Sequence, residues 1–156
     1  MTDLHPFDDA THLTQLGDGI YQGRTTPRYA NMAGPYGGIT AACLMRAVLI
    51  DPRLAGTPVS ITVNLCAAVA DGTFEMKVTQ IRSGKYIQHW AVELTQGDRI
   101  CTTASVITAV RGESFAHHPE MLPEVPPPGD VPISQATQRL PWLKAYDFRF
   151  VSGTPD

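Results

Sequence analysis

The sequence predicts an α+β fold in which an antiparallel sheet of about five strands wraps around one long buried helix. The first observation is the segment 34–48, where a turn rich in glycine and proline leads into a helix that is apolar on nearly every side. A helix that is hydrophobic all round is expected to be buried rather than to lie on a surface. The second observation is that the segments after it alternate apolar and polar residues and are joined by short turns, which is typical of an antiparallel meander.

Each element follows from a local pattern. Residues 11–26 predict a first strand that is irregular or bulged, because three glycines interrupt it. The helix is predicted to run from Gly37 to near Asp51, because Pro52 restricts the residue before it. Alternating apolar side chains then predict four strands at 59–65, 73–82, 88–94 and 100–110, with turns at 71–72, 83–85 and 97–98.

Composition excludes several classes of function. The 156 residues carry a net charge of −3, so no general basic field favours nucleic acid as a partner. No apolar run approaches the ~18 residues of a membrane span, and the first residues lack a signal sequence. The three cysteines at 43, 66 and 101 have no metal-ligand spacing and are expected to be reduced thiols. We therefore expect a cytoplasmic protein with no metal, no cofactor and no membrane partner.

The chain divides into three parts by composition. Residues 1–111 contain the predicted helix and sheet and form the domain. Eight of the 13 prolines fall between Pro119 and Pro155, so residues 112–145 are expected to be a proline-rich, linker-like tail. Residues 146–156 begin with an alternating pattern, Tyr146 to Val151, which predicts an additional strand.

The order of a strand, a buried helix and an antiparallel meander resembles the hotdog fold. Four ordered motifs are similar to the first half of type II acyl-CoA thioesterases, which join two hotdog units in one chain: Gly34–Gly38, Val59–Val63, Arg82–Lys85 and Trp90–Leu94. The similarity runs from about 11 to 111, and residues 146–153 resemble the beginning of a second unit. This resemblance implies a coenzyme A thioester, or the thioester of another acyl carrier, as the ligand. It also implies hydrolysis by direct attack of water.

The start of the helix is the first candidate for catalysis. Backbone N–H groups at Gly37 and Gly38 would lie at the positive end of the helix and could stabilise the negative charge that develops on a thioester carbonyl oxygen. The alternative is that these glycines only allow close packing of the helix against the first strand. Tyr36 could border an acyl pocket, or it could be a packing aromatic residue where the helix begins.

A compact basic turn is the second candidate. Arg82, Ser83, Gly84 and Lys85 place two cations and free amides in one hairpin, which suits the phosphates of coenzyme A. The alternative is an ordinary solvated turn. The pattern is not a P-loop, because the GxxxxGK[ST] spacing is absent.

A general base is missing from the predicted site. No carboxylate occurs from Gly37 to Ile50, and in the family the catalytic Asp lies on the second unit. A hydrolase would need a carboxylate from an N-terminal loop or from another subunit. Two alternatives therefore stay open: a catalytically silent hotdog that binds acyl thioesters or serves as a structural subunit, and a truncated half of a double-hotdog thioesterase. Because a single hotdog sheet has exposed edges, we also expect a homodimer, or a higher homo-oligomer formed through the sheet edges.

Overall fold

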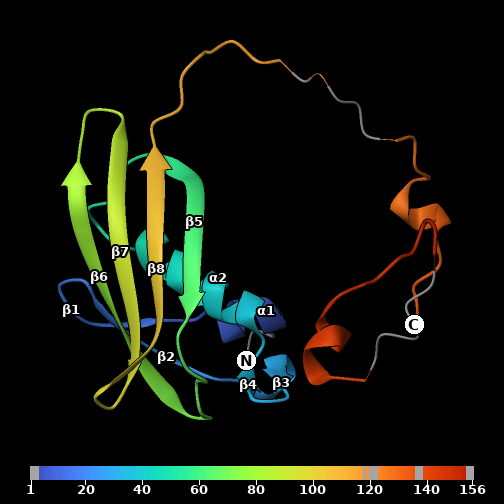
Figure 1. Ribbon diagram of the computed structural model, residues 1–156, viewed down its shortest axis with the longest axis horizontal. Coiled ribbons are helices and arrows are strands. Elements are labelled where there is room, and N and C mark those ends of the chain that lie inside the picture. The colour runs from blue at the N-terminus through green and yellow to red at the C-terminus, as the bar shows by residue number, and fades with distance from the viewer. Residues whose placement is uncertain (1–3, 118, 120–122, 136–138, 154–156) are drawn as a thin grey trace.

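One six-stranded antiparallel sheet forms the body of the protein. The computed structural model describes residues 4–117, 119, 123–135 and 139–153. The strand order is β1–β2–β6–β7–β8–β5, and helix α2 lies against one face of this sheet (Figure 1). The strands are β1 (Thr14–Gly17), β2 (Ile20–Arg24), β5 (Thr57–Leu65), β6 (Thr73–Ser83), β7 (Ile87–Gln96) and β8 (Arg99–Ala109). The predicted arrangement of an antiparallel sheet on one central helix is confirmed.

The predicted first strand is two strands. β1 and β2 form a hairpin, because Gly19 adopts a φ of 67°, which favours glycine and reverses the chain. The carbonyl of Gly19 also accepts a hydrogen bond of 2.7 Å from the N–H of Val78 on β6. This turn explains why the sheet has six strands instead of the expected five.

Helix α2 (Gly37–Leu49) ends two residues before Asp51, close to the predicted limit, and it is buried on one side rather than all round. Cys43, Leu44, Ala47 and Val48 face the sheet and are at most 3% exposed. Arg46 and Leu49 lie on the other side and are exposed, while Met45 is half-buried and packs at the edge of the core. The sheet of one chain therefore covers only one face of an unusually apolar helix. Within the described part of the chain, no helix is both long and apolar enough to cross a membrane.

The hydrophobic core lies between α2 and the inward side chains of the four long strands. The largest of its fully buried side chains are Trp90, Tyr21, Leu44, Met76 and Leu94. At the C-terminal end of α2, the fully buried carboxylate of Asp51 accepts two hydrogen bonds from the guanidinium of Arg53, at 2.8 and 2.7 Å, and one from the hydroxyl of Tyr21 at 3.3 Å. Because these donors favour the charged form, the pKa of Asp51 is held below its ordinary value.

Short elements connect the first hairpin to α2. Helix α1 (Pro6–Ala10) precedes β1, and the 3-10 turn η1 (Pro27–Tyr29) follows β2. A two-residue hairpin, β3 (Ala30–Asn31) with β4 (Gly34–Pro35), then leads directly into α2. The N–H of Tyr36 donates to the carbonyl of Tyr29 at 2.7 Å and fixes this hairpin against η1.

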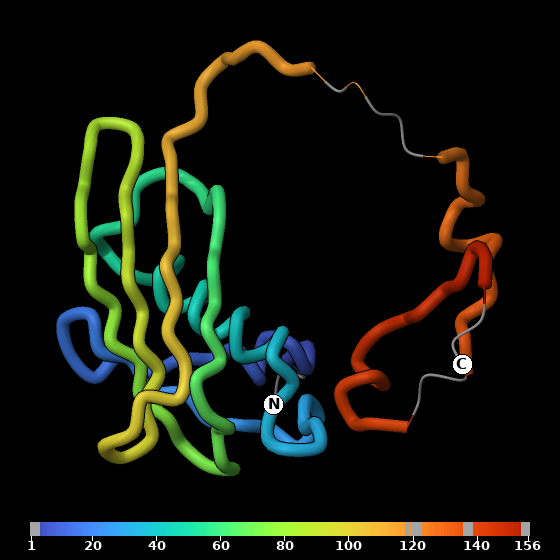
Figure 2. Tube along the Cα trace, viewed as in Figure 1, coloured from blue at the N-terminus to red at the C-terminus, as the bar shows by residue number. Residues whose placement is uncertain are grey.

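The tail leaves β8, loops away from the sheet and returns to the opposite end of the molecule (Figure 2). It contains two 3-10 turns, η2 (Pro128–Asp130) and η3 (Pro141–Ala145). Trp142 in η3 stacks on Tyr36, with ring centroids 4.0 Å apart and planes 2° apart. The end of the proline-rich stretch therefore docks on the domain, next to η1 and the start of α2.

The structure assigns no strand to residues 146–153, where the alternating pattern predicted one. Tyr146 and Phe148 instead join an aromatic cluster with Trp142, at centroid distances of 6.1 to 6.4 Å. The N–H of Ser134 donates to the carbonyl of Phe148 at 2.8 Å. A strand needs a neighbouring strand for its other hydrogen bonds, and the sheet ends at β5 and β1, away from this segment.

Candidate functional site

The start of α2 presents two unpaired backbone donors. Tyr36 is the N-cap residue and makes no side-chain cap, while its carbonyl accepts the N–H groups of Ile39 and Thr40. Among the described residues, no acceptor pairs with the N–H of Gly37 or Gly38. The helix dipole adds partial positive charge at the same place. This end of α2 can therefore bind an anion or a polarised carbonyl oxygen.

A cavity of about 330 Å³ adjoins these donors. The β3–β4 hairpin, the first turn of α2, the end of β5 with the loop after it, and β8 form its walls. Its lining residues are Asn31, Ala33, Gly34, Pro35, Gly37, Thr40, Leu65, Ala67, Ala68, Val69 and Thr102. Most of these side chains are small or apolar, so the cavity suits a neutral or acyl group next to a polar carbonyl.

Two backbone features hold this cavity open. Gly34 has a φ of 128°, and a Cβ there would lie 2.6 Å from the carbonyl oxygen of Val69, so only glycine fits between the hairpin and the loop. The N–H groups of Cys66 and Ala67 both donate to the carbonyl of Cys101, each at 2.9 Å. These bonds turn the chain away from β5 and carry it past the start of α2.

Thr102 contributes a buried hydroxyl to the same cavity. It lies on the inward face of β8, directly opposite Leu65 of β5 and Leu94 of β7. The residue is 0% exposed, and its Oγ1 has no hydrogen-bond partner among the described residues. An unsatisfied buried hydroxyl costs about 1–3 kcal/mol. A ligand oxygen in the cavity would satisfy this hydroxyl together with the N–H of Gly37.

Tyr36 packs against neighbouring residues and does not line this cavity. Its ring lies over Gly38, so closely that a Cβ on Gly38 would be 2.3 Å from Tyr36 Cε1. The ring also stacks on Trp142 and meets the ring of Tyr146 edge to face, at a centroid distance of 6.3 Å. The structure therefore places Tyr36 between the helix start and the tail, as a packing aromatic residue where the helix begins.

The basic turn lies at the other end of the sheet. Ser83 is opposite Gln88 on β7, whereas Thr102 is opposite Leu94, six residues further along that strand. At ~3.4 Å per residue, the two places are about 20 Å apart. Figure 1 shows the β6–β7 turn and the β3–β4 hairpin at opposite ends of the sheet. Within one chain, Arg82 to Lys85 and the Gly37 amides are therefore not brought together.

Side chains for acid–base chemistry are absent from the cavity. Among its lining residues there is no carboxylate, histidine or cysteine. Burial raises the pKa of the Cys43 thiol to about 12, and this thiol donates to the carbonyl of Ala10 at 3.4 Å. Within the described residues, no three His, Cys, Asp or Glu side chains group in a way that could hold a metal ion. Among the described residues that line it, the cavity offers hydrogen-bond donors to a carbonyl group but no general base.

Sequence reasoning missed Thr102 and Trp142. The alternation of Thr102, Ala104, Val106 and Thr108 along β8 indicates that these side chains face inward, and it identifies Thr102 as a buried polar residue. The docking of Trp142 was not predicted, because a proline-rich composition is typical of a linker. A tryptophan in such a segment is the signal that indicates packing, since this large side chain is usually buried.

The fold and the cavity at its helix start define a hotdog domain, and comparisons with known proteins agree. A conserved protein of unknown function with a hot dog fold from Alicyclobacillus acidocaldarius is 36% identical, with a TM-score of 0.92 over 97% of this chain and 57% of that one. The acyl-CoA thioesterase II TesB2 from Mycobacterium marinum is 20% identical, with a TM-score of 0.67, and the match covers 81% of this chain and 47% of that one. The tesB protein of Mycobacterium avium subs. paratuberculosis is 19% identical, with a TM-score of 0.71, and the match covers 82% of this chain and 50% of that one.

Residues 25–109, more than half of the chain, match the acyl-CoA thioesterase N-terminal domain, and the chain belongs to this family. The predicted relationship to the N-terminal half of type II thioesterases is thereby confirmed. The chain spans about half the length of these solved relatives. A search of curated proteins found no match.

Proposed function

We propose that this domain binds an acyl-CoA-type thioester and presents its carbonyl group for hydrolysis. The carbonyl oxygen would accept hydrogen bonds from the N–H of Gly37 and the hydroxyl of Thr102, with the acyl group against Leu65 and Val69. The observation that carries this proposal is that the unpaired amide of Gly37 and a buried hydroxyl without a partner among the described residues line one small cavity whose side chains are mostly small or apolar. Family membership supports a thioester as the ligand.

The reaction would be direct attack by water. The water oxygen bonds to the carbonyl carbon, and the negative charge that develops on the carbonyl oxygen is stabilised by Gly37 and Thr102. The carbon–sulfur bond then breaks, giving the free acid and the thiol of coenzyme A. Preorganised donors at this oxygen stabilise the transition state more than the ground state, which is what accelerates the step.

The base that activates water would come from a second hotdog unit, because the cavity of this chain has none. We propose that a second copy of the chain supplies that unit in a homodimer. Two features support such pairing: β5 is an edge strand with one unpaired side, and the outer face of α2 carries exposed Leu49 and half-buried Met45. In a dimer, the partner would pair with the free hydrogen-bonding groups of β5 and cover the apolar side chains on the outer face of α2.

The second candidate is a catalytically silent domain that binds acyl thioesters. The same observation, a polarising cavity without a carboxylate, favours it. The two candidates differ only in whether a competent base reaches the bound thioester.

One pair of assays decides between them. The purified protein is incubated with acyl-CoAs of several chain lengths and a thiol-trapping dye, and binding of the same acyl-CoAs is measured by calorimetry. Turnover supports the hydrolase, and binding without turnover supports the silent domain. The absence of both contradicts the proposal. Sedimentation at micromolar concentration tests the dimer, and a monomer there contradicts the proposed pairing.

A further inference from the structure

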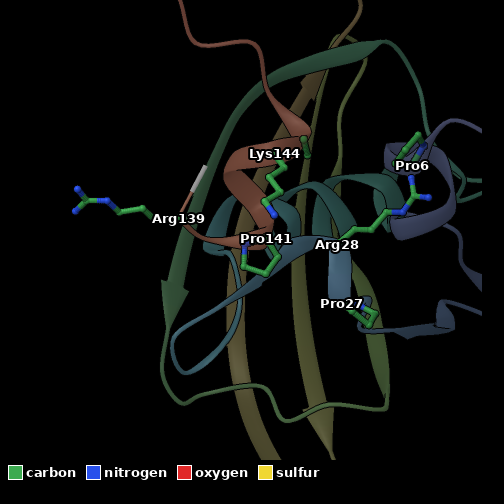
Figure 3. A pocket seen from close by; sticks show the side chains of 7 residues that line it. Pro6, Pro27, Arg28, Arg139, Pro141 and Lys144 are labelled. Atoms are coloured by element: carbon green, nitrogen blue, oxygen red, sulfur yellow. The ribbon is translucent and has the colours of Figure 1, made fainter. Parts of the chain in front are cut away.

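The docked tail and the domain enclose a second, larger cavity of about 560 Å³. One wall comes from the N-terminal segments, with Pro6 of α1 and Pro27 and Arg28 of η1. The other wall comes from the end of the tail, with Arg139, Pro141, Lys144 and Ala145 (Figure 3). The cavity exists only because η3 packs against η1, and the Tyr36–Trp142 stack holds that contact.

The chemistry of this cavity is that of an anion site with flat apolar walls. Three of its seven lining residues are cations and none is acidic, in a chain whose net charge is −3. The ion pairs between described residues join Arg24 to Asp9, Arg53 to Asp51 and Arg149 to Asp147, so none of them neutralises this group. Three prolines supply rigid apolar surface beside the charges. Phosphates next to an aromatic base would satisfy both the cations and the apolar walls.

Two of the cations lie on opposite walls of this cavity. Figure 3 shows the side chain of Arg28 reaching toward Pro6 of α1 and the side chain of Lys144 lying over η3 toward Pro141, whereas the side chain of Arg139 extends away from both. Arg28 and Lys144 come from segments more than 100 residues apart in the sequence (28 and 144). Each wall carries one of these two charges, so a ligand that contacts both must span the cavity.

Tyr36 connects the elements that form this cavity to the start of α2. Tyr36 is the N-cap residue of α2, its N–H is bound by η1, and its ring is stacked on η3. The two elements that carry Arg28 and Lys144 therefore both contact the residue that precedes Gly37. A coenzyme A thioester has the matching form, because a flexible neutral arm joins its reactive carbonyl to a nucleotide with several phosphates.

We propose that Arg28 and Lys144 bind the phosphorylated nucleotide end of coenzyme A in the cavity between η1 and η3. The tail is then part of the substrate site rather than a linker. This inference rests on the proposed function for its choice of nucleotide. It differs from the expectation that Arg82 to Lys85 bind the phosphates, since that turn lies at the other end of the sheet.

The test measures nucleotide binding separately from turnover. Adenosine 3′,5′-bisphosphate is titrated into the full chain by calorimetry, and the fluorescence of Trp142, which lies between Pro141 and Lys144, is recorded in parallel. The double variant Arg28→Gln/Lys144→Gln is expected to weaken binding at least 10-fold and to reduce its salt dependence. Both side chains are exposed, so the variant is expected to fold normally.

Two comparison variants keep the result specific. Arg82→Gln/Lys85→Gln makes the same charge change at the other end of the sheet, and Lys77→Gln reports the effect of net charge alone. Equal or greater loss of binding in Arg82→Gln/Lys85→Gln would overturn the proposal. So would unchanged binding in Arg28→Gln/Lys144→Gln.

Turnover separates this inference from the proposed function. If the protein is a hydrolase, Arg28→Gln/Lys144→Gln should raise KM for an acyl-CoA at least 10-fold while leaving the hydrolysis of an acyl-pantetheine, which lacks the nucleotide, unchanged. A rise for both substrates, or for neither, contradicts the nucleotide site while leaving the proposed function intact. Nucleotide binding that depends on Arg28 and Lys144, in a protein without turnover, supports the site and contradicts the hydrolase.

Discussion

Tyr36 and Trp142 are stacked face to face, with ring centroids 4.0 Å apart, and this contact joins the C-terminal tail to the N-cap residue of α2. Because of this contact, the end of the proline-rich segment forms one wall of the larger cavity, the candidate nucleotide site. Aromatic pairs of this kind contribute about 0.5–1.5 kcal/mol beyond the area that they bury. The stack is therefore strong enough to hold the tail but weak enough to be broken by one substitution.

Trp142→Ala should release the tail while the domain stays folded. The stack on Tyr36 and the contacts with Tyr146 and Phe148 are all lost. We expect rapid trypsin cleavage at Lys144 and Arg149, with the melting temperature of the domain little changed. Trp142→Phe keeps an aromatic ring and should remain protected. Equal cleavage of the wild type and Trp142→Ala would contradict the docking of the tail.

Gly34→Ala should destabilise the protein by roughly 1–3 kcal/mol, because a Cβ cannot be accommodated at a φ of 128° beside the Val69 carbonyl. Denaturant unfolding followed by the fluorescence of buried Trp90 measures the change. Gly17→Ala is the matched control: no atom lies within 4 Å of a Cβ there, and its φ is not positive. Similar stability for both variants would show that the hairpin is not constrained in this way.

Asp51→Asn should lower the free energy of unfolding by roughly 2–3 kcal/mol at neutral pH. This loss is smaller than for a fully buried ion pair, because the Arg53 side chain is 34% exposed. The pKa of Asp51 is lower in the folded state than in the unfolded state, chiefly through its hydrogen bond with Arg53. Its contribution is therefore present above the unfolded pKa and is lost as the pH falls through the lower folded pKa.

The pH dependence supplies the check for Asp51. Unfolding free energies measured from pH 7 down to pH 3 should converge for the wild type and Asp51→Asn as the solution becomes acidic. Asp98→Asn, at an exposed turn, should parallel the wild type throughout. A constant difference between the wild type and Asp51→Asn over this range would be inconsistent with a depressed pKa.

The three cysteines should differ sharply in reactivity. Cys66 is exposed, whereas Cys43 and Cys101 are buried, and burial raises the pKa of Cys43 to about 12. A thiol reagent under native conditions should label one thiol quickly, and Cys66→Ser should abolish that labelling. Fast labelling of Cys43 would contradict its place in the core.

Most of the domain could be predicted from the sequence because its patterns are local. Helix α2 was bounded by Gly37 and the Asp51–Pro52 pair, and β5 to β8 follow the alternation of buried and exposed residues to within a few residues. The split into β1 and β2 was missed because several glycines occur in that segment, and only the hydrogen bond from Val78 selects Gly19 for the turn.

The candidate site was predicted only in part. The amides of Gly37 and Gly38 follow from the helix-start motif. Thr102, which lines the same cavity as Gly37, comes from a strand more than 60 residues later, and only the fold brings these two residues to one cavity. The docking of Trp142 on Tyr36 depends in the same way on tertiary contact. Arg82 and Ser83 are the last residues of β6, and Gly84 and Lys85 follow in the loop to β7; their distance from the helix start is set by strand register, which composition does not encode.

Hydrolysis of an acyl-CoA by Thr102→Val and by Thr103→Val tests the central claim most directly. Both variants replace a hydroxyl with a methyl group on neighbouring residues of β8, but Thr102 lines the cavity, whereas Thr103 is on the other face and accepts a hydrogen bond from Asn64. If Thr102 and Gly37 bind the thioester oxygen, Thr102→Val should lower kcat/KM by about 100-fold, and Thr103→Val should retain wild-type activity. Full activity in Thr102→Val, with turnover in the wild type, would contradict the account.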